Sequence, residues 1–315
     1  MSKYSIGIDI GGTNTDIGLV NEEGRVVGRN RIPTQQYTSA EAYIVAMEEG
    51  IRDLMTAFQV TQIESIGIGA PNSNYYEGCI DEGTANLPIK ERIPLKSIME
   101  SDFGVPVVVD NDANAAAFGE LIYGGGKGMR HLITITLGTG IGSGIVVDGK
   151  LVHGHTGTAG ELGHSIVIPD GRACSCGRRG CIEMYASARG ICLNYAEAAT
   201  LAGKPLSQTD IQNITCQMIG EAAVQGDPIA CKAYDITAKW LGIALANAAN
   251  FSAPQAIFLM GGPTRAGEAL MKPLRNYFNE NLLYIYKGKI SLQLSQLNGN
   301  DAAILGSAAL GKNIR

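Results

Sequence analysis

The sequence predicts an α/β fold that contains an internal duplication. The β-rich run "YSIGIDI" (4–10) is followed by further strands and a helix, which is an α/β pattern. The apolar run "VPVVVD" (105–110) is typical of a buried strand, and the helical segment "NDANAAAFGEL" follows it at once. The duplication is indicated by residues 131–154, "HLITITLGTGIGSGIVVDGKLVHG", because their layout repeats that of residues 4–29.

Composition narrows the class of protein. The chain has 315 residues, of which 45% are hydrophobic and 17% charged, so it can bury a large core and is long enough for two domains. Its net charge of −5, with Lys and Arg scattered along the chain, offers no basic face to nucleic acid. No apolar run reaches the roughly 18 residues of a membrane span, and the N-terminus lacks the apolar core of a signal peptide. We therefore expect a cytoplasmic protein without nucleic-acid or membrane partners.

The first elements form a meander followed by a helix. After the first strand, two further strands (16–20 and 25–32) are joined by a turn at Glu23-Gly24. Thr38 and Glu41 then have the spacing of a capping box at the start of a helix. The predicted helix has an apolar stripe formed by Tyr43, Ile44, Met47, Ile51, Leu54, Met55 and Phe58.

Each copy of the repeat contains a glycine-rich hairpin. Residues 8–11 align with residues 135–138, so the second copy begins about 127 positions after the first. Glycine allows the backbone to approach an anion closely and to direct successive N–H groups at phosphate oxygens. Two such hairpins would hold a polyphosphate, and the alternative is that both are tight turns in a β-rich meander.

Five segments together carry a resemblance to a known family. They are "GIDIGGTNT" (7–15), "VDNDANAAAFGE" (109–120), "TLGTGIGSGIVVDGKLVHG" (136–154), "AGELGH" (159–164) and "CSCGRRGCIEMYAS" (174–187). In this order they resemble the ROK family of bacterial sugar kinases, within the sugar kinase, Hsp70 and actin superfamily, over nearly the whole chain. The resemblance implies two actin-like, ribonuclease H-like lobes with a duplicated β-hairpin core and an interlobe cleft.

The resemblance also divides the chain. It implies a small N-terminal lobe made of residues 1–118 and 301–315, which holds the catalytic base and the first phosphate hairpin. Residues 119–300 would form a large C-terminal lobe with the second phosphate hairpin, a cysteine loop, the adenosine site and the contacts of a homodimer. The small-residue helix at 301–311 would then return to the first lobe.

The cysteine loop has the donors of a metal site. His164, Cys174, Cys176 and Cys181 supply one imidazole and three thiolates, a set that suits tetrahedral Zn²⁺ in a structural role. The alternative is a surface loop of free thiols, which would be sensitive to oxidation without any gain in packing. The seven cysteines are an odd number, and in a reducing compartment thiols or metal ligands are favoured over disulfides. The remaining cysteines read as small core or surface residues.

The sugar site follows from the same motifs. In the family, the residues that match Glu161, His164 and Glu183 contact sugar hydroxyls, and carboxylates form strong charge-assisted bonds to them. The resemblance adds Asn86 and Asn111 to this set. For each glutamate alone, the alternative is a solvated surface charge.

The resemblance assigns the general base to Asp112. This residue stands just after a buried strand and at the start of a helix, where ligand sites of α/β sheets lie. Asn111 would bond the sugar beside it, while Asp110 and Asn114 are interpreted as turn and cap residues. Phosphoryl transfer also needs Mg²⁺ on the phosphates of ATP, and Asp9 is its expected partner through water.

The nucleotide site is expected on both hairpins and one further turn. The hairpin residues are Gly11, Gly12, Thr13, Asn14, Gly138, Thr139 and Gly140. Gly261 and Gly262 end an apolar strand at 256–260, and in the superfamily such a turn packs against adenosine. The alternative is a strand-to-helix turn without a ligand.

The expected activity is ATP-dependent phosphorylation of an aldohexose at its 6-hydroxyl. Glucose is the first choice of acceptor, and N-acetylglucosamine, N-acetylmannosamine, mannose or fructose are alternatives. The loop at 70–74 departs from the Gly-Pro-Gly of many members and leaves the sugar open, and Asp16 adds an unusual carboxylate after the first hairpin. A repressor of the family would need a winged-helix domain ahead of Asp9, and a silent sugar sensor is disfavoured because Asp112 is present.

Overall fold

The computed structural model describes residues 3–84, 87–297, 299 and 301–314, and these residues form two compact units. The first unit comprises the described residues of Met1–Arg130, Gly144–Ala159 and Ser295–Arg315. The second comprises His131–Ser143 and Gly160–Leu294. The lobe boundaries expected near residues 118 and 301 stay a prediction, because the two units are defined by their internal contacts and not as the lobes of a kinase.

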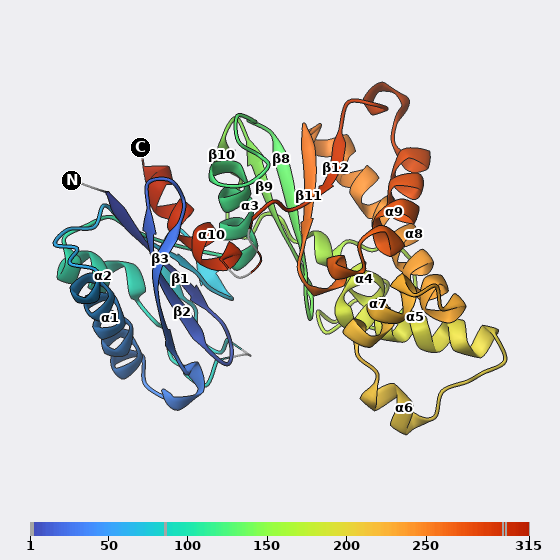
Figure 1. Ribbon diagram of the computed structural model, residues 1–315, viewed down its shortest axis with the longest axis horizontal. Helices are drawn as coiled ribbons and strands as arrows, with labels where there is room; N and C mark the ends of the chain where they lie inside the picture. Colours follow the sequence, from blue (N-terminus) through green and yellow to red (C-terminus); the bar gives the residue numbers. More distant parts are fainter. Residues whose placement is uncertain (1–2, 85–86, 298, 300, 315) are drawn as a thin grey trace. The chain divides into compact units, whose positions relative to one another are not determined.

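A five-stranded mixed sheet lies in the first unit (Figure 1). Its strands are β1 (Tyr4–Ile10), β2 (Thr15–Asn21), β3 (Val26–Ile32), β4 (Ile66–Gly69) and β7 (Val107–Asp110), in the order β3-β2-β1-β4-β7. The first three strands form an antiparallel meander, and β1, β4 and β7 are parallel. The predicted meander is therefore confirmed.

The second sheet repeats this order, which confirms the predicted α/β fold with a duplicated hairpin core. Its strands are β8 (Leu132–Leu137), β9 (Ile141–Val147), β10 (Lys150–Leu151), β11 (Ala256–Met260) and β12 (Ser291–Leu294), in the order β10-β9-β8-β11-β12. Here β10 is antiparallel to β9, while β8, β11 and β12 are parallel. The first unit also has a short hairpin of β5 (Ser73–Asn74) and β6 (Cys79–Ile80).

The two faces of the first sheet carry different residues. Isoleucines such as Ile8 and Ile68 are buried with the apolar stripe of α1 (Ala40–Ala57), and α2 (Leu95–Phe103) adds to the same core. The stripe is mostly as predicted, although its last residue, Phe58, is 45% exposed. The predicted capping box is wrong, because Ser39 is the N-cap and its side chain accepts a hydrogen bond from the backbone N–H of Ala42.

Glycines on the opposite face allow α10 (Ala302–Leu310) to approach the sheet (Figure 1). A Cβ atom on Gly67 would lie 1.8 Å from the carbonyl oxygen of Ser307, so only glycine fits there. The helix α3 (Asp112–Ile122) also crosses α10 closely, since a Cβ on Gly119 would lie 2.7 Å from Cα of Gly306. The C-terminal helix thus packs on the sheet formed by the N-terminal strands.

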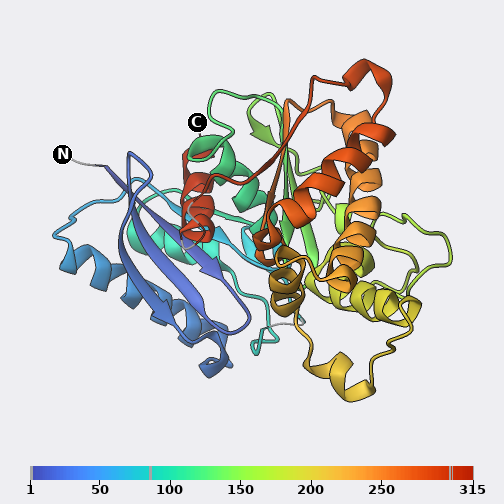
Figure 2. The same ribbon diagram turned by 45° about the vertical axis from the view of Figure 1, so that its right-hand side comes forward.

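Helices form most of the rest of the second unit (Figure 2). They are α4 (Glu183–Ala186), α5 (Ala188–Leu201), α6 (Gln208–Asn213), α7 (Cys216–Val224), α8 (Pro228–Ser252) and α9 (Glu268–Asn281). The long helix α8 packs between α9 and α5, and its buried face is rich in alanine, which permits close helix contacts. Short 3₁₀ helices are η1 (Thr34–Gln36), η2 (Leu162–His164), η3 (Gly262–Ala266), η4 (Tyr284–Tyr286) and η5 (Gly311–Ile314).

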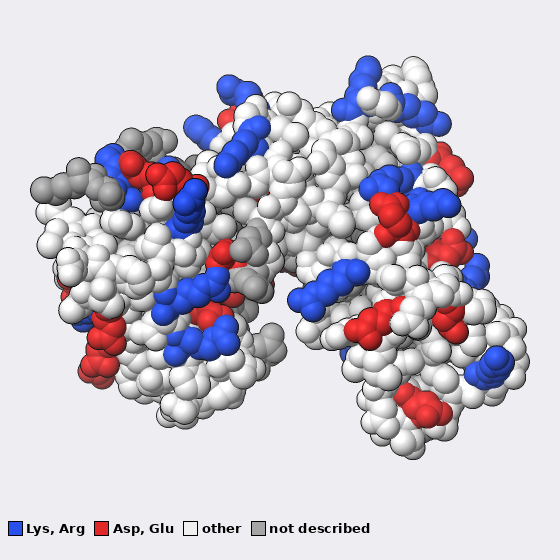
Figure 3. All heavy atoms as spheres, viewed as in Figure 1, with Lys and Arg blue, Asp and Glu red and all other residues white. Residues whose placement is uncertain are grey.

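Charged side chains are mixed on the surface. On the face drawn in Figure 3, Lys and Arg alternate with Asp and Glu, and no broad basic area is seen. Among the described residues, no helix combines the length and the apolar character that crossing a membrane requires.

Candidate active site

The junction between β7 and α3 presents the predicted base at a helix N-terminus. Asn111 is the N-cap, and its side-chain oxygen accepts a hydrogen bond of 2.8 Å from the backbone N–H of Ala113. Asp112 is the first residue of the helix, where the dipole and free N–H groups favour a carboxylate. The interpretation of Asp110 and Asn114 as turn and cap residues is therefore wrong for the cap, which Asn111 supplies through its own side chain.

Asp9 lies close to this junction at the same edge of the sheet. In the register of the three parallel strands, Asp9 pairs with Gly69, and Gly69 pairs with Asp110. Burial raises the pKa of Asp9 to about 6, and the neighbouring carboxylates of Asp112 and Asp16 contribute to the rise. Burial also raises the pKa of Asp112, although the backbone N–H of Ala113 opposes this. Asp9 is half-buried and Asp112 stays accessible to solvent, and two neighbouring carboxylates with raised pKa values favour a cation or a proton beside them.

Asp16 is held by a partner and does not extend freely into solvent. It lies opposite Asp9 on β2, and its carboxylate forms a bidentate pair with Arg31 on β3 at 2.6 and 3.1 Å. The side chain of Asp16 is 32% exposed. Its charge is thus largely matched by the guanidinium, and it acts on Asp9 as a secondary influence.

Each of the two glycine-rich turns is closed by a backbone hydrogen bond within the turn. In the first, the N–H of Gly11 donates to the carbonyl of Asn14 at 3.0 Å, and in the second the N–H of Gly138 donates to the carbonyl of Gly140 at 2.9 Å. The side chain of Gln35 also donates to the carbonyl of Gly12. Both turns leave their inner N–H groups available to a ligand, as an anion-binding hairpin requires.

A cavity of about 560 Å³ in the second unit brings together three of the predicted nucleotide residues, Gly138, Thr139 and Gly262. Its other wall is α7, which contributes Cys216, Gln217, Gly220, Glu221, Val224 and Gln225. Gly261 lies beside this cavity with φ of +105°, and its Cβ would meet the carbonyl oxygen of Leu137 at 2.0 Å. The α7 wall was missed in the sequence, where the segment shows only an ordinary apolar stripe.

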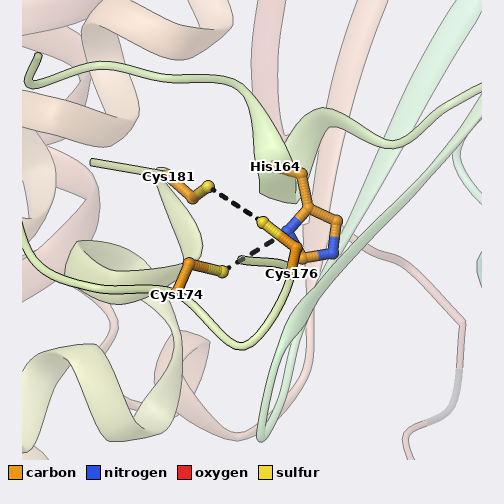
Figure 4. A group of neighbouring side chains, drawn as sticks. All are labelled: His164, Cys174, Cys176 and Cys181. Atoms are coloured by element: carbon orange, nitrogen blue, oxygen red, sulfur yellow. Dashed lines mark hydrogen bonds between the residues drawn. The ribbon is translucent and has the colours of Figure 1, made fainter. Parts of the chain in front are cut away.

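His164, Cys174, Cys176 and Cys181 converge in the cysteine loop (Figure 4). Their ligand atoms all lie within 4.8 Å of one another. Nδ1 of His164 is 3.6 Å from Sγ of Cys174, and the Sγ atoms of Cys176 and Cys181 are also 3.6 Å apart. Tetrahedral zinc with ordinary bond lengths places its ligand atoms about 3.5–3.8 Å apart. The donor set and its spacing therefore fit a zinc site.

Local groups prepare one of these thiols for a metal. The backbone N–H and the guanidinium of Arg178 lower the pKa of Cys176 to about 6, while burial raises that of Cys181 to about 12. A cation at the centre of the cluster would stabilise the thiolate form of every cysteine in it. The free cysteines outside the loop take no part in the cluster.

The predicted sugar contacts on the second unit meet around Ile141. A Cβ on Gly163 would lie 2.2 Å from the carbonyl oxygen of Ile141, and the carboxylate of Glu183 accepts a bond of 3.1 Å from its N–H. His164 directs Nδ1 to the cluster, and its Nε2 lies 3.9 Å from the carboxylate of Glu161. Glu161 thus lies beside His164 of the cysteine loop, and the carboxylate of Glu183 is tied to the second hairpin.

The structure therefore groups the predicted site residues within each unit. Asp9, Asn111 and Asp112 lie in the first unit. The cysteine loop, the remaining predicted sugar contacts and the cavity lie in the second unit. Asn86 lies outside the described residues. Sequence reasoning missed His153, whose Nε2 is 2.7 Å from the carboxylate of Asp110. A histidine next to a glycine in a loop gives no local signal of such a partner.

The fold consists of an α/β unit with a hairpin, and this unit is duplicated. The protein also has an acidic strand-to-helix junction and a His-Cys₃ loop. Together these features define a class of two-unit kinase-like folds. The family model of the ROK family matches residues 5–314, and the chain belongs to this family. The predicted resemblance is thereby confirmed.

Two relatives are glucokinases. The glucokinase of Streptomyces coelicolor is 35% identical over 315 residues, which cover 98% of this chain and 97% of the relative. A crystal structure of a ROK family glucokinase from Streptomyces griseus, in complex with glucose and AMPPNP, is 35% identical, with a TM-score of 0.78 and coverage of 98% and 99%. The xylose repressor of Bacillus subtilis is more distant, at 30% identity over 98% of this chain and 76% of the repressor.

Proposed function

We propose that this protein is an ATP-dependent glucokinase that transfers the γ-phosphoryl group of ATP to the 6-hydroxyl of glucose. The observation that carries the proposal is the pair of neighbouring carboxylates, Asp9 and Asp112, which lie at the carboxyl edge of the first sheet and both have a raised pKa. The glucokinase relatives that match this chain along nearly its whole length support glucose as the acceptor. Cytoplasmic location and a homodimer stay predictions.

Asp112 accepts the proton of the attacking hydroxyl in this proposal. Its pKa is raised by burial, so a carboxylate at neutral pH is a stronger base than one in water. Asn111 keeps its amide nitrogen for the sugar, because its side-chain oxygen is engaged by the helix N-terminus. Together they would orient the hydroxyl for transfer.

Each glycine-rich turn would offer backbone N–H groups to phosphate oxygens, and the cavity beside Gly262 would hold the adenosine. Asp9 would hold a water ligand of magnesium, and magnesium when bound neutralises charge on the phosphates. Glu221 and Gln217, hydrogen-bonded to each other at 2.9 Å, are two polar side chains of the α7 wall. They offer hydroxyl-binding groups to a ribose.

Zinc would have a structural role. With three thiolates and one imidazole, no coordination position remains for a substrate. Because His164 uses Nδ1 for the cluster, its Nε2 is available to a sugar hydroxyl next to Glu161. The metal would therefore order the sugar contacts without taking part in phosphoryl transfer.

A sugar sensor without kinase activity is the second candidate, because a xylose repressor also matches the chain. A coupled assay of ADP release over a panel of hexoses, N-acetylhexosamines and xylose separates the two. We expect turnover on the order of 1–100 s⁻¹ with glucose, as is ordinary for kinases. Tight sugar binding by calorimetry without ADP release on any sugar would favour the sensor and contradict the glucokinase.

A further inference from the structure

The carboxylate of Asp110 is buried next to the predicted base and has three hydrogen-bond donors. Its Oδ1 accepts from the backbone N–H of Asn111 at 2.7 Å and from the side chain of Asn114 at 2.8 Å. Its Oδ2 lies 2.7 Å from Nε2 of His153, and the two side chains are 1% and 9% exposed. Two of the donors thus belong to the junction that presents Asp112, and the third comes from a distant loop.

The ring of His153 is held in place by Tyr75, which directly follows the loop at 70–74. Tyr75 stacks on it with ring centroids 3.6 Å apart and an interplanar angle of 11°. The backbone of the same segment is fixed as well, because the N–H of Ala159 donates to the carbonyl of His153, and the hydroxyl of Tyr76 donates to that of Gly154. All of these residues lie in the first unit.

We propose that His153 is a positioning residue for phosphoryl transfer, acting through Asp110 on Asn111 and Asp112; the proposal rests on the kinase function above. Without the donor of His153, Oδ2 of Asp110 would be a buried carboxylate oxygen lacking a partner, which is costly. The carboxylate would turn to recover a donor. Because the N–H of Asn111 and the side chain of Asn114 are bound to this carboxylate, they would move with it. The start of α3 would follow.

We expect the loss of the hydrogen bond between His153 and Asp110 to lower kcat. Displacement of a base by about 1 Å is enough to lower a rate by up to 10²-fold, because the reacting atoms lose their alignment. The residues that line the proposed nucleotide cavity belong to the second unit, whereas His153 and Asp110 belong to the first. The KM for ATP should therefore stay near its wild-type value.

Three variants of the full-length protein test the proposal by steady-state kinetics with glucose and ATP. His153→Phe keeps an aromatic ring against Tyr75 and removes the donor. His153→Gln keeps an amide N–H near the place of Nε2. His155→Phe makes the same change at an exposed position two residues further along the loop. We expect His153→Phe to lower kcat on the order of 10-fold or more with the KM for ATP within about twofold, and His153→Gln to recover most of the loss.

A double-mutant cycle identifies the path. If His153 acts through Asp110, then His153→Phe should lower kcat much less in an Asp110→Asn background than in the wild type. Thermal melting of each variant shows whether a lower kcat reflects folded enzyme. A kcat for His153→Phe equal to that of His155→Phe, or a loss that Gln does not restore in folded protein, would overturn the inference.

The outcomes distinguish this inference from the proposed function. An active wild type whose His153→Phe variant has unchanged kcat overturns the positioning role and leaves the kinase in place. A wild type that releases ADP with no sugar of the panel overturns the kinase, and the positioning role with it.

Discussion

Asp9 and Asp112 show how a residue's chemistry is set by its neighbours. Both are aspartates with the same intrinsic acidity, and each acquires a raised pKa because the sheet edge and the start of α3 bury it. Asp16 is close enough to contribute to Asp9, yet it is itself paired with Arg31. The environment therefore gives Asp9 and Asp112 raised pKa values, whereas Asp16 is held in an ion pair with Arg31.

Replacing Asp112 tests the base. Asp112→Asn should lower kcat by on the order of 10² or more while glucose still binds, because only the interaction with the transferring proton is lost. Kinetics and glucose calorimetry on the same preparation measure the two effects. Asp53→Asn, at an exposed position on α1, is the matched control. Near-normal turnover in Asp112→Asn would contradict the assignment.

The pKa of Asp9 predicts how stability depends on pH. A folded-state pKa of about 6, above the ordinary value of 3.8, means that the folded protein binds this proton more tightly than the unfolded chain. The resulting stabilisation is fully present below pH 3.8 and is lost as the pH rises through 6.

In metal-free buffer, Asp9→Asn should therefore melt at a higher temperature than the wild type at pH 7.5, and the difference should shrink toward pH 4. Scanning fluorimetry over this range measures it. A variant that is less stable than the wild type at pH 7.5 would show that Asp9 is held by favourable partners in the folded state.

The same reasoning gives a direction for activity. Asp112 must be ionised to accept a proton, and burial raises its pKa. As the pH falls, kcat/KM for glucose should decline at a higher pH than an ordinary aspartate would cause. A pH profile that stays flat down to the pH range in which an ordinary aspartate titrates would contradict a base with a raised pKa.

At the scale of elements, small residues decide how closely helices and strands pack. Gly119 and Gly306 let α3 and α10 cross almost in backbone contact, and Gly67 does the same for α10 on the sheet. The helix that carries Asp112 is thus supported by the C-terminal helix. A loss of packing at this crossing should therefore also destabilise the junction that carries Asp112.

Gly119→Ala should lower the free energy of unfolding by roughly 1–3 kcal/mol, because its Cβ has no room and the helices must separate. Chemical denaturation measures this. Gly299→Ala, where a Cβ would meet nothing within 4 Å, is the control and should change stability little. Equal stability of the two variants would mean that the crossing relaxes without cost.

We propose that the cysteine loop is ordered by one zinc ion held by His164 and the three cysteines. Purified protein should contain about one zinc per chain, and Cys176→Ser or chelation should raise the KM for glucose far more than that for ATP. The reason is that Glu161 lies beside His164 and Glu183 follows Cys181 by two residues, while the cavity beside Gly262 is formed by other residues. Cys231→Ser, at an exposed cysteine outside the cluster, is the control. Metal-free protein with an unchanged KM for glucose would contradict the proposed role.

At the scale of the whole molecule, duplication has produced two sheets with the same order and different tasks. Asp9 of β1 aligns with Thr136 of β8, so only the first copy places a carboxylate beside the base. Only the second copy is joined to α7 and to the turn at Gly262, which together surround the cavity. The first unit thus carries the carboxylates of Asp9 and Asp112, and the second unit carries a nucleotide-sized cavity.

Short segments of sequence were sufficient for the parts of the molecule that depend on near neighbours. The hairpins, the strand-to-helix junction at Asp112, the cysteine loop and the apolar stripe of α1 are each contained in a run of a few to twenty residues. Within such a run, glycine conformation, hydrogen bonding to the adjacent backbone and hydrophobic periodicity are enough to define the local structure. Even here the cap shifted by one residue, because Thr38 and Ser39 compete for the same role.

Contacts between distant segments could not be predicted in this way. His153 is 43 residues from Asp110, and α7 reaches the cavity across a chain of intervening helices. Such pairs depend on how sheets and helices pack, and the side chains involved carry no distinguishing pattern of their own. Burial, which raises the pKa values of Asp9 and Asp112, is likewise a property of the packed protein, because only the folded chain removes water from these carboxylates.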